Sequence, residues 1–541
     1  MNSLLKELGT TGLGGAFLLS ACRTPDRIAV LDSKGARVAY RDLSTRALAL
    51  AAVLERKFGK DEAPRVGVCL PPGALGALVN VALALGGRAS VNLNAVAGPA
   101  ALREQVEHAG LSSVILARSA TALAPLLGER ALFVEDLEDE VSASDLDRAA
   151  EVAQLPREEL QQLCDDLRDE RRIATVLFSS GSTSRPKAIQ LSHASVLANA
   201  RAVASAFDLA PDDRVLGVLP FFHSFGYTVT LWAPLVAGAS VVFHDNPLDA
   251  RGVGELAAAE RPTVMLATPA LCQAWMRRIE PEQLASVRLT IVGAQRLQPT
   301  LASAWRERFG TLLYEGYGCT ELAPVVAANL PDVDGRVRRR AGSVGRPIPG
   351  VELEIRDPQT GERLPADAEG DLWVHSPGLM QGYLGDEAAT RRAIVDGWYD
   401  TQDVARVDRD GFLTLTDRRS RFSKIGGEMV SHGAVECALT AAAIALGEPA
   451  TLGLAVTALD DEQRGERLVV LHTPLLHGIE SLLERARKDG LSNLFTPRAA
   501  DAFEVEALPQ LATGKIDLGK LKKLAAESRR SQTAEHGRAR A

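Results

Sequence analysis

Short runs of β-branched and other apolar residues alternate with Ala- and Leu-rich stretches between residues 28 and about 320. The short runs indicate buried strands, and the stretches between them carry apolar residues at helical spacing. Strands that alternate with helices in this way predict β-α units and largely parallel sheets. Strands are expected at 28–31, 65–70, 113–117, 214–219, 240–243, 263–267 and 289–292, and typical helices at 43–54 and 253–260.

Beyond about residue 342 the pattern changes, because Gly, Pro and Asp recur every few residues between short apolar runs. The runs at 351–355, 370–375 and 411–415 predict an antiparallel subdomain. The predicted class is α/β: a large N-terminal domain of stacked mixed and parallel sheets with helices, that subdomain, and a small α+β C-terminal domain. The domains are expected at 1–417 and 418–525, followed by a flexible polar tail at 526–541.

Two segments depart from this regular pattern. Residues 136–171 are acidic and weakly periodic, which favours an excursion over the surface. The apolar run at 13–22 ends in Leu-Ser-Ala-Cys and resembles a bacterial lipoprotein cleavage site. However, Glu7 cancels the charge of Lys6 and glycines interrupt the run, so a first helix of the domain is favoured over an export signal.

Composition narrows the compartment and the partners. The net charge of −8 argues against a nucleic-acid partner. The six cysteines are scattered without a C-x-x-C pair, which favours a reducing compartment over a disulfide framework or a zinc site. No run reaches the roughly 18 uninterrupted apolar residues of a spanning helix. We therefore expect a cytoplasmic protein without a transmembrane segment, for which only peripheral membrane contact stays open.

A cluster of Ser, Thr and Gly follows the apolar run 173–178 and leads to Lys187. Small residues let several backbone N–H groups point at one spot, and hydroxyls and an ammonium add donors and charge for phosphate oxygens. A second strand at 188–191 and a helix near His193 follow, whereas a P-loop enters its helix directly. The residues expected to bind phosphates are Ser179, Ser180, Gly181, Ser182, Thr183 and Lys187.

This loop resembles the phosphate loop of the adenylate-forming superfamily, which includes acyl-CoA synthetases, luciferases and nonribosomal-peptide adenylation domains. Four further motifs follow in that family's order, at 314–321, 397–403, 417–431 and 508–517. Each alone also fits an ordinary turn or linker, but their shared order argues against coincidence. The chain is identified as a member of this superfamily, most similar to its bacterial acyl-[acyl-carrier-protein] synthetases. The resemblance implies the adenylate-forming fold, with a small C-terminal domain that moves between two half-reactions.

The resemblance also implies a role for several residues of the nucleotide site. Tyr317 is expected to stack on adenine beside Gly318, Thr320 to contact the α-phosphate, and Glu321 to hold Mg²⁺. An ionised carboxylate suits the job of accepting two ribose hydroxyls, which the resemblance gives to Asp403. The neighbouring residue, Gln402, stands where relatives usually have glycine, and nothing in the sequence explains it.

Other implied roles fall in the C-terminal part of the chain. Arg418 is expected to reach ribose or phosphate, and Ser420 to lie at the hinge, where relatives mostly have Asp or Lys. Gly426 and Gly427 would let a pantetheine arm pass close to the backbone. Lys515 matches the lysine that bridges the carboxylate and the α-phosphate during adenylation, a suitable task for a flexible ammonium.

Residues 219–228 match the family's segment beside the acyl pocket, and His223 is expected to act in catalysis there. Gly226 is expected to leave room, so that a long apolar acid threads inward. The alternative is a core loop with a satisfied histidine. The expected pocket residues are Phe222, His223, Gly226, Tyr227, Gly293 and Ala294.

The predicted function is ATP- and Mg²⁺-dependent activation of a fatty acid to acyl-AMP with release of pyrophosphate. The acyl group then passes to a phosphopantetheine thiol, with acyl carrier protein as the leading acceptor and coenzyme A as the alternative. Further alternatives are an acyl- or aryl-AMP ligase and a nucleotide-binding protein without turnover. Several arginines form either a basic docking face for an acidic carrier protein or an ordinary solvated face. They are Arg336, Arg338, Arg339, Arg340, Arg418, Arg419 and Arg421.

Overall fold

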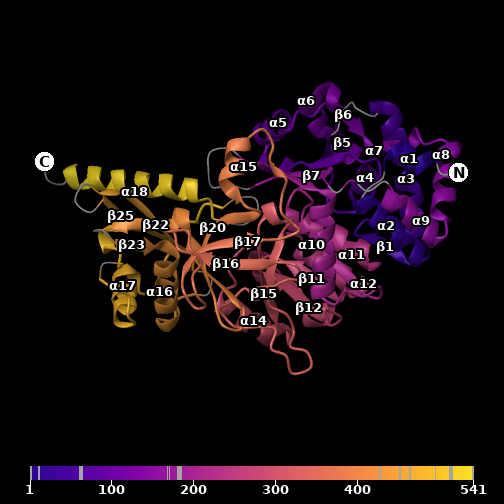
Figure 1. Ribbon diagram of the computed structural model, residues 1–541. Helices are drawn as coiled ribbons and strands as arrows, with labels where there is room; N and C mark the ends of the chain where they lie inside the picture. Colours follow the sequence, from indigo (N-terminus) through magenta and orange to yellow (C-terminus); the bar gives the residue numbers. More distant parts are fainter. Residues whose placement is uncertain are drawn as a thin grey trace. The chain divides into compact units, whose positions relative to one another are not determined.

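The computed structural model describes residues 3–9, 12–59, 65–166, 169, 171–179, 186–425, 428–449, 452–461, 465–493, 495–510 and 516–538. The chain divides into two compact units (Figure 1). The first contains the residues up to Ser179, Pro186–Leu353 and Val374–Tyr399, and the second contains Glu354–Trp373 and the residues from Asp400 onward.

A nine-stranded sheet in the first unit has the order β15-β14-β13-β12-β11-β9-β10-β1-β2. Its six central strands, β13 to β1, pair in parallel, and antiparallel strands flank them at both edges. This confirms the prediction of largely parallel sheets. The strands are β1 Ile28–Asp32, β2 Arg37–Ala39, β9 Arg214–Gly217, β10 Ser240–Phe243, β11 Val264–Ala267, β12 Leu289–Val292, β13 Leu313–Gly318, β14 Val325–Ala328 and β15 Arg346–Pro347.

A seven-stranded sheet in the same unit has the order β18-β8-β7-β4-β3-β5-β6. The last five of these strands are parallel, whereas β8 runs antiparallel to both β7 and β18. The short second strand predicted after Lys187 is therefore confirmed as β8. The strands are β3 Arg65–Cys69, β4 Ala89–Asn92, β5 Val114–Leu116, β6 Ala131–Phe133, β7 Ile173–Phe178, β8 Ala188–Ser192 and β18 Gly382–Tyr383.

The helices of the first unit bury apolar faces against these sheets and against one another. The helix predicted over 13–22 is present as α2 (Gly12–Arg23), although a short helix, α1 (Ser3–Leu8), precedes it. Helix α2 packs against α3 (Tyr40–Phe58), α4 (Ala74–Leu85) and α10 (His193–Ala206). Almost every residue of α4 is buried, which explains its largely apolar composition; the one polar residue, Asn80, donates to the carbonyl of Gly76 at 2.8 Å. Ser192 begins α10, because its hydroxyl accepts a hydrogen bond from the backbone N–H of Ser195.

The acidic segment 136–171 is more ordered than expected. It contains two helices, α8 (Ala143–Ala153) and α9 (Arg157–Asp166), which pack on α3 and α2 respectively. The prediction of a surface excursion is therefore wrong for α8, whose residues Ala149 and Val152 are buried. This amphipathic helix was not predicted, because its composition is acidic and only one narrow face of it is apolar.

A third sheet has the order β16-β17-β20-β19, with β21 also paired to β20. The chain crosses between the two units within β16, β17 and β20. The β19–β20 and β20–β21 pairs are antiparallel, as predicted for this part of the chain. The strands are β16 Glu352–Arg356, β17 Gly370–His375, β19 Ile394–Val395, β20 Trp398–Val407 and β21 Leu413–Arg418.

The last sheet lies between helices on both of its faces. In β24 (Leu454–Asp461), Val456 joins a cluster with residues of α16 (His432–Ala445) and α17 (Gly478–Lys488), whereas its neighbour Ala455 joins a second cluster with α18 (Leu518–Arg538). This alternation follows from the two-residue period of a strand. The buried residues of both clusters come from 425–525. The remaining strands of the sheet are β22 Phe422–Ile425, β23 Glu428–Ser431, β25 Gly465–His472 and β26 Ala502–Glu504.

In the part of the chain that the structure describes, every helix is too short or too polar to cross a lipid bilayer.

Candidate active site

Lys187 lies where strands β7 and β8 face each other. The backbone N–H of Ser179 donates to the carbonyl of Lys187 at 2.9 Å, and the N–H of Lys187 donates to the Ser179 hydroxyl at 3.2 Å. The two ends of the predicted phosphate loop are thus joined at its base. Ser180, Gly181, Ser182 and Thr183 lie outside the described residues.

Glu321 lies in a 3₁₀ turn, Thr320–Leu322, that follows β13. The side chain of Asn199 fixes this turn, because it donates to the carbonyl of Leu322 at 3.2 Å and exchanges hydrogen bonds with the backbone of Val325. Gly318 is required before the turn, since a Cβ at this position would lie 2.2 Å from the carbonyl oxygen of Pro324. The Glu321 side chain therefore starts from a rigid backbone.

A third segment brings Lys187 and Glu321 together. Strand β18 pairs with β8 so that Tyr383 stands opposite Ile189, two residues after the lysine. The backbone N–H of Met380 donates to the carbonyl of Glu321 at 2.8 Å. The hydroxyl of Tyr383 donates to Glu321 Oε1 at 3.1 Å, and Lys187 Nζ lies 4.5 Å from the centre of the same ring. The two predicted phosphate and metal residues thus contact one tyrosine.

The surroundings of this cluster set the protonation of its hydroxyls. The hydroxyl of Tyr399 lies 3.5 Å from that of Tyr383, and both residues are buried. Burial, assisted by the charge of Glu321, raises the pKa of Tyr383 and of Tyr399 above the ordinary value. Both therefore stay protonated and able to donate. Sequence reasoning missed them, because a buried aromatic residue in a strand is usual for a core.

Glu315, on strand β13, was also missed. Its carboxylate accepts the backbone N–H of Leu297 at 3.0 Å. Burial raises its pKa to about 7, although this hydrogen bond and the charge of Arg296 act in the opposite direction. One strand thus carries a titratable carboxyl group next to Tyr317, which is half-buried and stands opposite Ala327 of β14.

Asp403 and Arg418 form an ion pair in the second unit. They stand opposite each other in β20 and β21, and Arg418 Nε lies 2.9 Å from Asp403 Oδ1. The carboxylate is buried and the arginine side chain is 55% exposed. The structure thus brings these two predicted nucleotide residues together. Ser420 lies in the 3₁₀ turn Arg419–Arg421, whereas Gly426, Gly427 and Lys515 lie outside the described residues.

Gln402 is explained by its backbone. Its φ angle is +61°, in the left-handed region that favours glycine, and its N–H donates to Asp400 Oδ1 at 3.0 Å. The position therefore needs the conformation that glycine adopts most easily, which accounts for the usual residue of the resembling family. In this chain glutamine adopts it instead.

Comparison with known proteins decides the family. A family model described as AMP-binding enzyme matches residues 17–384. This chain belongs to the AMP-binding enzyme family. The match confirms the resemblance seen in the motifs and the expectation of an enzyme.

The relatives of this AMP-binding enzyme include acid–thiol ligases. A long-chain-fatty-acid–CoA ligase of Escherichia coli O6:H1 is 27% identical over 538 residues, which cover 92% of each chain. A medium-chain-fatty-acid–CoA ligase of Ectopseudomonas oleovorans is 30% identical over 367 residues, which cover 64% of each chain. The names of these relatives agree with the predicted ligase class.

Solved structures confirm the predicted fold. ATP-bound MatB from Rhodopseudomonas palustris superposes with a TM-score of 0.79 at 23% identity, covering 94% of this chain and 98% of that chain. The amide bond synthetase McbA from Marinactinospora thermotolerans gives 0.76 at 25% identity, covering 94% and 99%.

In the expected acyl segment of the AMP-binding enzyme, residues 219–228, Gly226 is packed against backbone. A Cβ on Gly226 would lie 2.2 Å from the carbonyl oxygen of Pro220, so the expectation that this glycine leaves room for an acid is wrong. The neighbouring backbone fills that space. The segment Phe225–Trp232 is π-helical, and Tyr227 within it is fully buried, with its hydroxyl 3.3 Å from Ser90 Oγ.

Other expected pocket residues lie as follows. His223 Nδ1 accepts the backbone N–H of Phe225 at 3.2 Å, and Phe222 is half-buried. Gly293 faces the ring of Phe225, since a Cβ there would lie 3.4 Å from it, and Ala294 has a left-handed φ of +69°. Phe225 is thus the contact that links the segment 219–228 to Gly293.

The arginines expected to attract an acidic carrier are largely neutralised. In the first unit, Arg338 pairs with Asp208 and Arg339 pairs with Asp332. In the second unit the pairs are Arg418–Asp403, Arg419–Asp371 and Arg421–Glu436. These carboxylates weaken the field that a carrier protein would meet.

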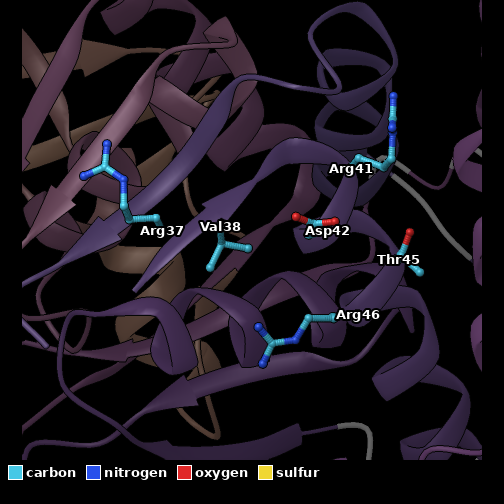
Figure 2. Close-up of a pocket in the computed structure, with 6 residues that line it drawn as sticks. All are labelled: Arg37, Val38, Arg41, Asp42, Thr45 and Arg46. Atoms are coloured by element: carbon cyan, nitrogen blue, oxygen red, sulfur yellow. The ribbon is translucent and has the colours of Figure 1, made fainter. Parts of the chain in front are cut away.

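A surface hollow of about 390 Å³ lies at the edge strand β2 and the start of α3 (Figure 2). It carries no predicted site residue and lies at the opposite edge of the nine-stranded sheet from β13 and β14. Figure 2 shows the guanidinium groups of Arg37 and Arg41 pointing away from each other. Arg37 pairs with Glu260 at 2.6 Å and Arg41 with Asp26 at 2.9 Å, so the hollow offers little uncompensated charge. Its lining residues are Arg37, Val38, Arg41, Asp42, Thr45 and Arg46.

Proposed function

We propose that this chain activates a fatty acid with ATP and transfers the acyl group to a pantetheine thiol. The observation that carries the proposal is the placement of Lys187 and Glu321 against one tyrosine, within a chain of the AMP-binding enzyme family. An ammonium and a carboxylate that contact the same side chain suit a nucleotide phosphate group and its cation. The fatty acid is supported by the names of the long-chain and medium-chain relatives.

The reaction has two steps. A carboxylate oxygen of the acid attacks the α-phosphorus of ATP, and the bond between the α- and β-phosphates breaks to release pyrophosphate. The pantetheine sulfur then attacks the acyl carbon, loses its proton to water, and displaces AMP. Lys187 would pair with oxygens of the departing pyrophosphate, Thr320 would contact the α-phosphate, and Tyr317 would stack on adenine.

The residues present fit a magnesium ion. The described residues hold no group of three or more His, Cys, Asp or Glu side chains that could bind a metal ion. Magnesium is commonly held by one or two carboxylates together with substrate phosphates, so Glu321 alone is a sufficient protein donor. When bound, the ion neutralises phosphate charge. Asp403 would accept the ribose hydroxyls, with Arg418 beside it.

The remaining predicted residues border the acyl group or lie in the C-terminal part of the chain. His223, Phe222 and the contact between Phe225 and Gly293 would border the acyl group. Residues 418–525 would act as the mobile domain, which is supported by their two apolar clusters. Ser420 would be the hinge, Gly426 and Gly427 would line the pantetheine path, and Lys515 would act in adenylation.

The acceptor is proposed to be coenzyme A rather than a carrier protein. The relatives are named for coenzyme A, and the arginines available to a carrier mostly face carboxylates. The sequence motifs point instead to a carrier protein, so both acceptors are worth testing.

Pyrophosphate release over fatty acids of graded chain length, with an aryl acid for comparison, tests the first step. Thioester formation with coenzyme A and with carrier protein tests the second. Activity on aryl acids alone would replace the fatty acid, and thioester formed only on carrier protein would reverse the acceptor. The absence of pyrophosphate release with every acid would end the proposal.

A further inference from the structure

Tyr383 contacts both charged groups of the candidate site with different parts of one side chain. Its hydroxyl donates to Glu321 Oε1 at 3.1 Å, while its ring lies 4.5 Å from the ammonium nitrogen of Lys187. Only 5% of the residue is exposed. A side chain buried this deeply between two charges has little freedom to move away from either.

The backbone on either side of Tyr383 is held from several directions. Its own N–H donates to the Thr390 hydroxyl at 2.9 Å, and the N–H of Leu384 donates to the carbonyl of Ala188, next to the lysine, at 2.8 Å. On the other side, the hydroxyl of Ser195 donates to the carbonyl of Leu379 at 2.7 Å. The segment 379–384 is therefore a rigid brace between the lysine strand and the glutamate turn.

The hydroxyl of Tyr383 orients a carboxylate. A hydrogen bond to Oε1 fixes the rotation of the Glu321 carboxylate about its last side-chain bond, and with it the direction of the second oxygen. Hydrogen bonds to charged acceptors are stronger than neutral ones, so this orientation is held firmly. The hydroxyl of Tyr399 lies 3.5 Å from that of Tyr383 and adds a second polar contact to it.

The ring of Tyr383 limits a flexible lysine. Ordering a lysine side chain costs conformational entropy. A cation over an aromatic face recovers part of that cost, and it recovers more where the cation is desolvated. Lys187 is half-buried, so the ring holds its ammonium near the loop base before any anion arrives.

We propose that Tyr383 is a positioning residue for a nucleoside triphosphate and its magnesium ion: its hydroxyl orients Glu321 and its ring places Lys187. This inference rests on the proposed function and names a residue that acts through two others. The hydroxyl and the ring of Tyr383 then have separate effects on nucleotide binding. Loss of the hydroxyl affects the magnesium-dependent part of nucleotide binding, and loss of the ring also affects the part that needs no metal.

Calorimetric titration with ATP, in excess EDTA and then in excess Mg²⁺, measures the two parts. Tyr383→Phe keeps the ring, so its affinity for metal-free ATP is expected to stay unchanged, while the gain in affinity on adding Mg²⁺ falls about tenfold. Tyr383→Leu is expected to lose the same gain and to bind metal-free ATP several-fold more weakly. Tyr399→Phe, one hydroxyl further away, is expected to reduce the gain about twofold.

Tyr40→Phe is the matched control. Tyr40 is a fully buried tyrosine whose hydroxyl donates to the carbonyl of Ala239 at 2.7 Å, and it belongs to no part of the site. It is expected to leave both ATP affinities unchanged, and melting temperatures show whether each variant folds. A Tyr383→Phe protein with the full magnesium gain overturns the inference. The inference is also overturned if Tyr40→Phe and Tyr383→Phe both lose affinity for metal-free ATP and for ATP with Mg²⁺ in proportion to their loss of melting temperature.

The proposed function fails in a different way. Protein of unchanged sequence that binds ATP with magnesium but releases no pyrophosphate with any acid disproves the ligase and leaves the role of Tyr383 standing. Unchanged protein that binds no ATP under either condition disproves both.

Discussion

The Lys187–Tyr383–Glu321 cluster and the Asp403–Arg418 pair are built in opposite ways. The cluster joins three segments that are far apart in the sequence; Glu321 and Tyr383 alone are 62 positions apart. The pair joins two neighbouring strands, only 15 residues apart. The first site therefore depends on correct pairing of β18 with β8, whereas the second needs one hairpin. A site built from distant segments forms only when the whole fold forms, whereas a site within one hairpin can be predicted from a short motif.

The largest expected effect is on the long-range site. Lys187→Ala removes the ammonium expected to meet the departing phosphates, so the rate of pyrophosphate release should fall by a factor of about 100–1,000. The fold should persist, because the lysine is only half-buried. Lys34→Ala is a matched control, since that exposed lysine pairs with Asp245 at 3.1 Å and touches no site residue. Comparable activity in both variants would exclude Lys187 from the reaction.

Glu315 lets the same region be tested through pH. Burial raises its pKa from 4.5 to about 7, so the folded state keeps the proton over this range while the unfolded state releases it. The stabilising contribution of the protonated form is therefore present below about pH 4.5 and is lost as the pH rises through about 7. At most about 3 kcal/mol separates the two limits.

Glu315→Gln should remove this dependence. The free energy of unfolding of the unchanged protein, relative to the variant, should fall between about pH 4.5 and 7 and then level off. Denaturant titrations of both proteins at several pH values measure it. Parallel curves across the whole range would mean that the carboxyl group of Glu315 titrates normally.

The local pair should be asymmetric. Arg418→Ala leaves the buried carboxylate of Asp403 without its arginine, and should lower the free energy of unfolding by about 1–3 kcal/mol. Asp403→Asn leaves an arginine that is 55% exposed, and should lower it by less. Denaturant titration compares the two variants. Equal losses, or a larger loss in Asp403→Asn, would contradict the order argued from burial.

The smallest expected effect is a gain. Gln402→Gly relieves a left-handed backbone and should raise the free energy of unfolding by about 0.5–1 kcal/mol, since part of the relief is offset by the entropy of glycine in the unfolded chain. Gln359→Gly is the matched control. Its N–H also donates to an aspartate two residues earlier, Asp357, but its φ is not positive. Thermal unfolding should show the gain at Gln402 alone.

The two regions also differ in how far the sequence predicted them. Apolar runs placed β1, β9, β10, β11 and β12 of one large sheet and β3, β5, β7 and β8 of the other, because burial dictates their composition. The Asp403 and Arg418 motifs could be assigned singly, since each lies in a short local pattern. Tyr383 could not be, because its importance comes from the pairing of its strand with β8, almost two hundred positions away. Tyr399 stands in β20 beside β19, and its importance comes from the approach of its hydroxyl to that of Tyr383. The expectation for Gly226 was wrong for a local reason, because the chain turns back so that the carbonyls of Leu219 and Pro220 lie where its side chain would be.

The sheet formed by β22 to β26 has helices with apolar residues against both faces, α16 and α17 on one and α18 on the other. Because both faces of the sheet are covered, a rotation of this part as a rigid body would leave both apolar clusters intact. Swinging it between two orientations would therefore exchange only surface contacts with water, and no core would have to melt. If the C-terminal domain moves as proposed, a ligand changes the populations of its orientations only by as much as its affinity differs between them.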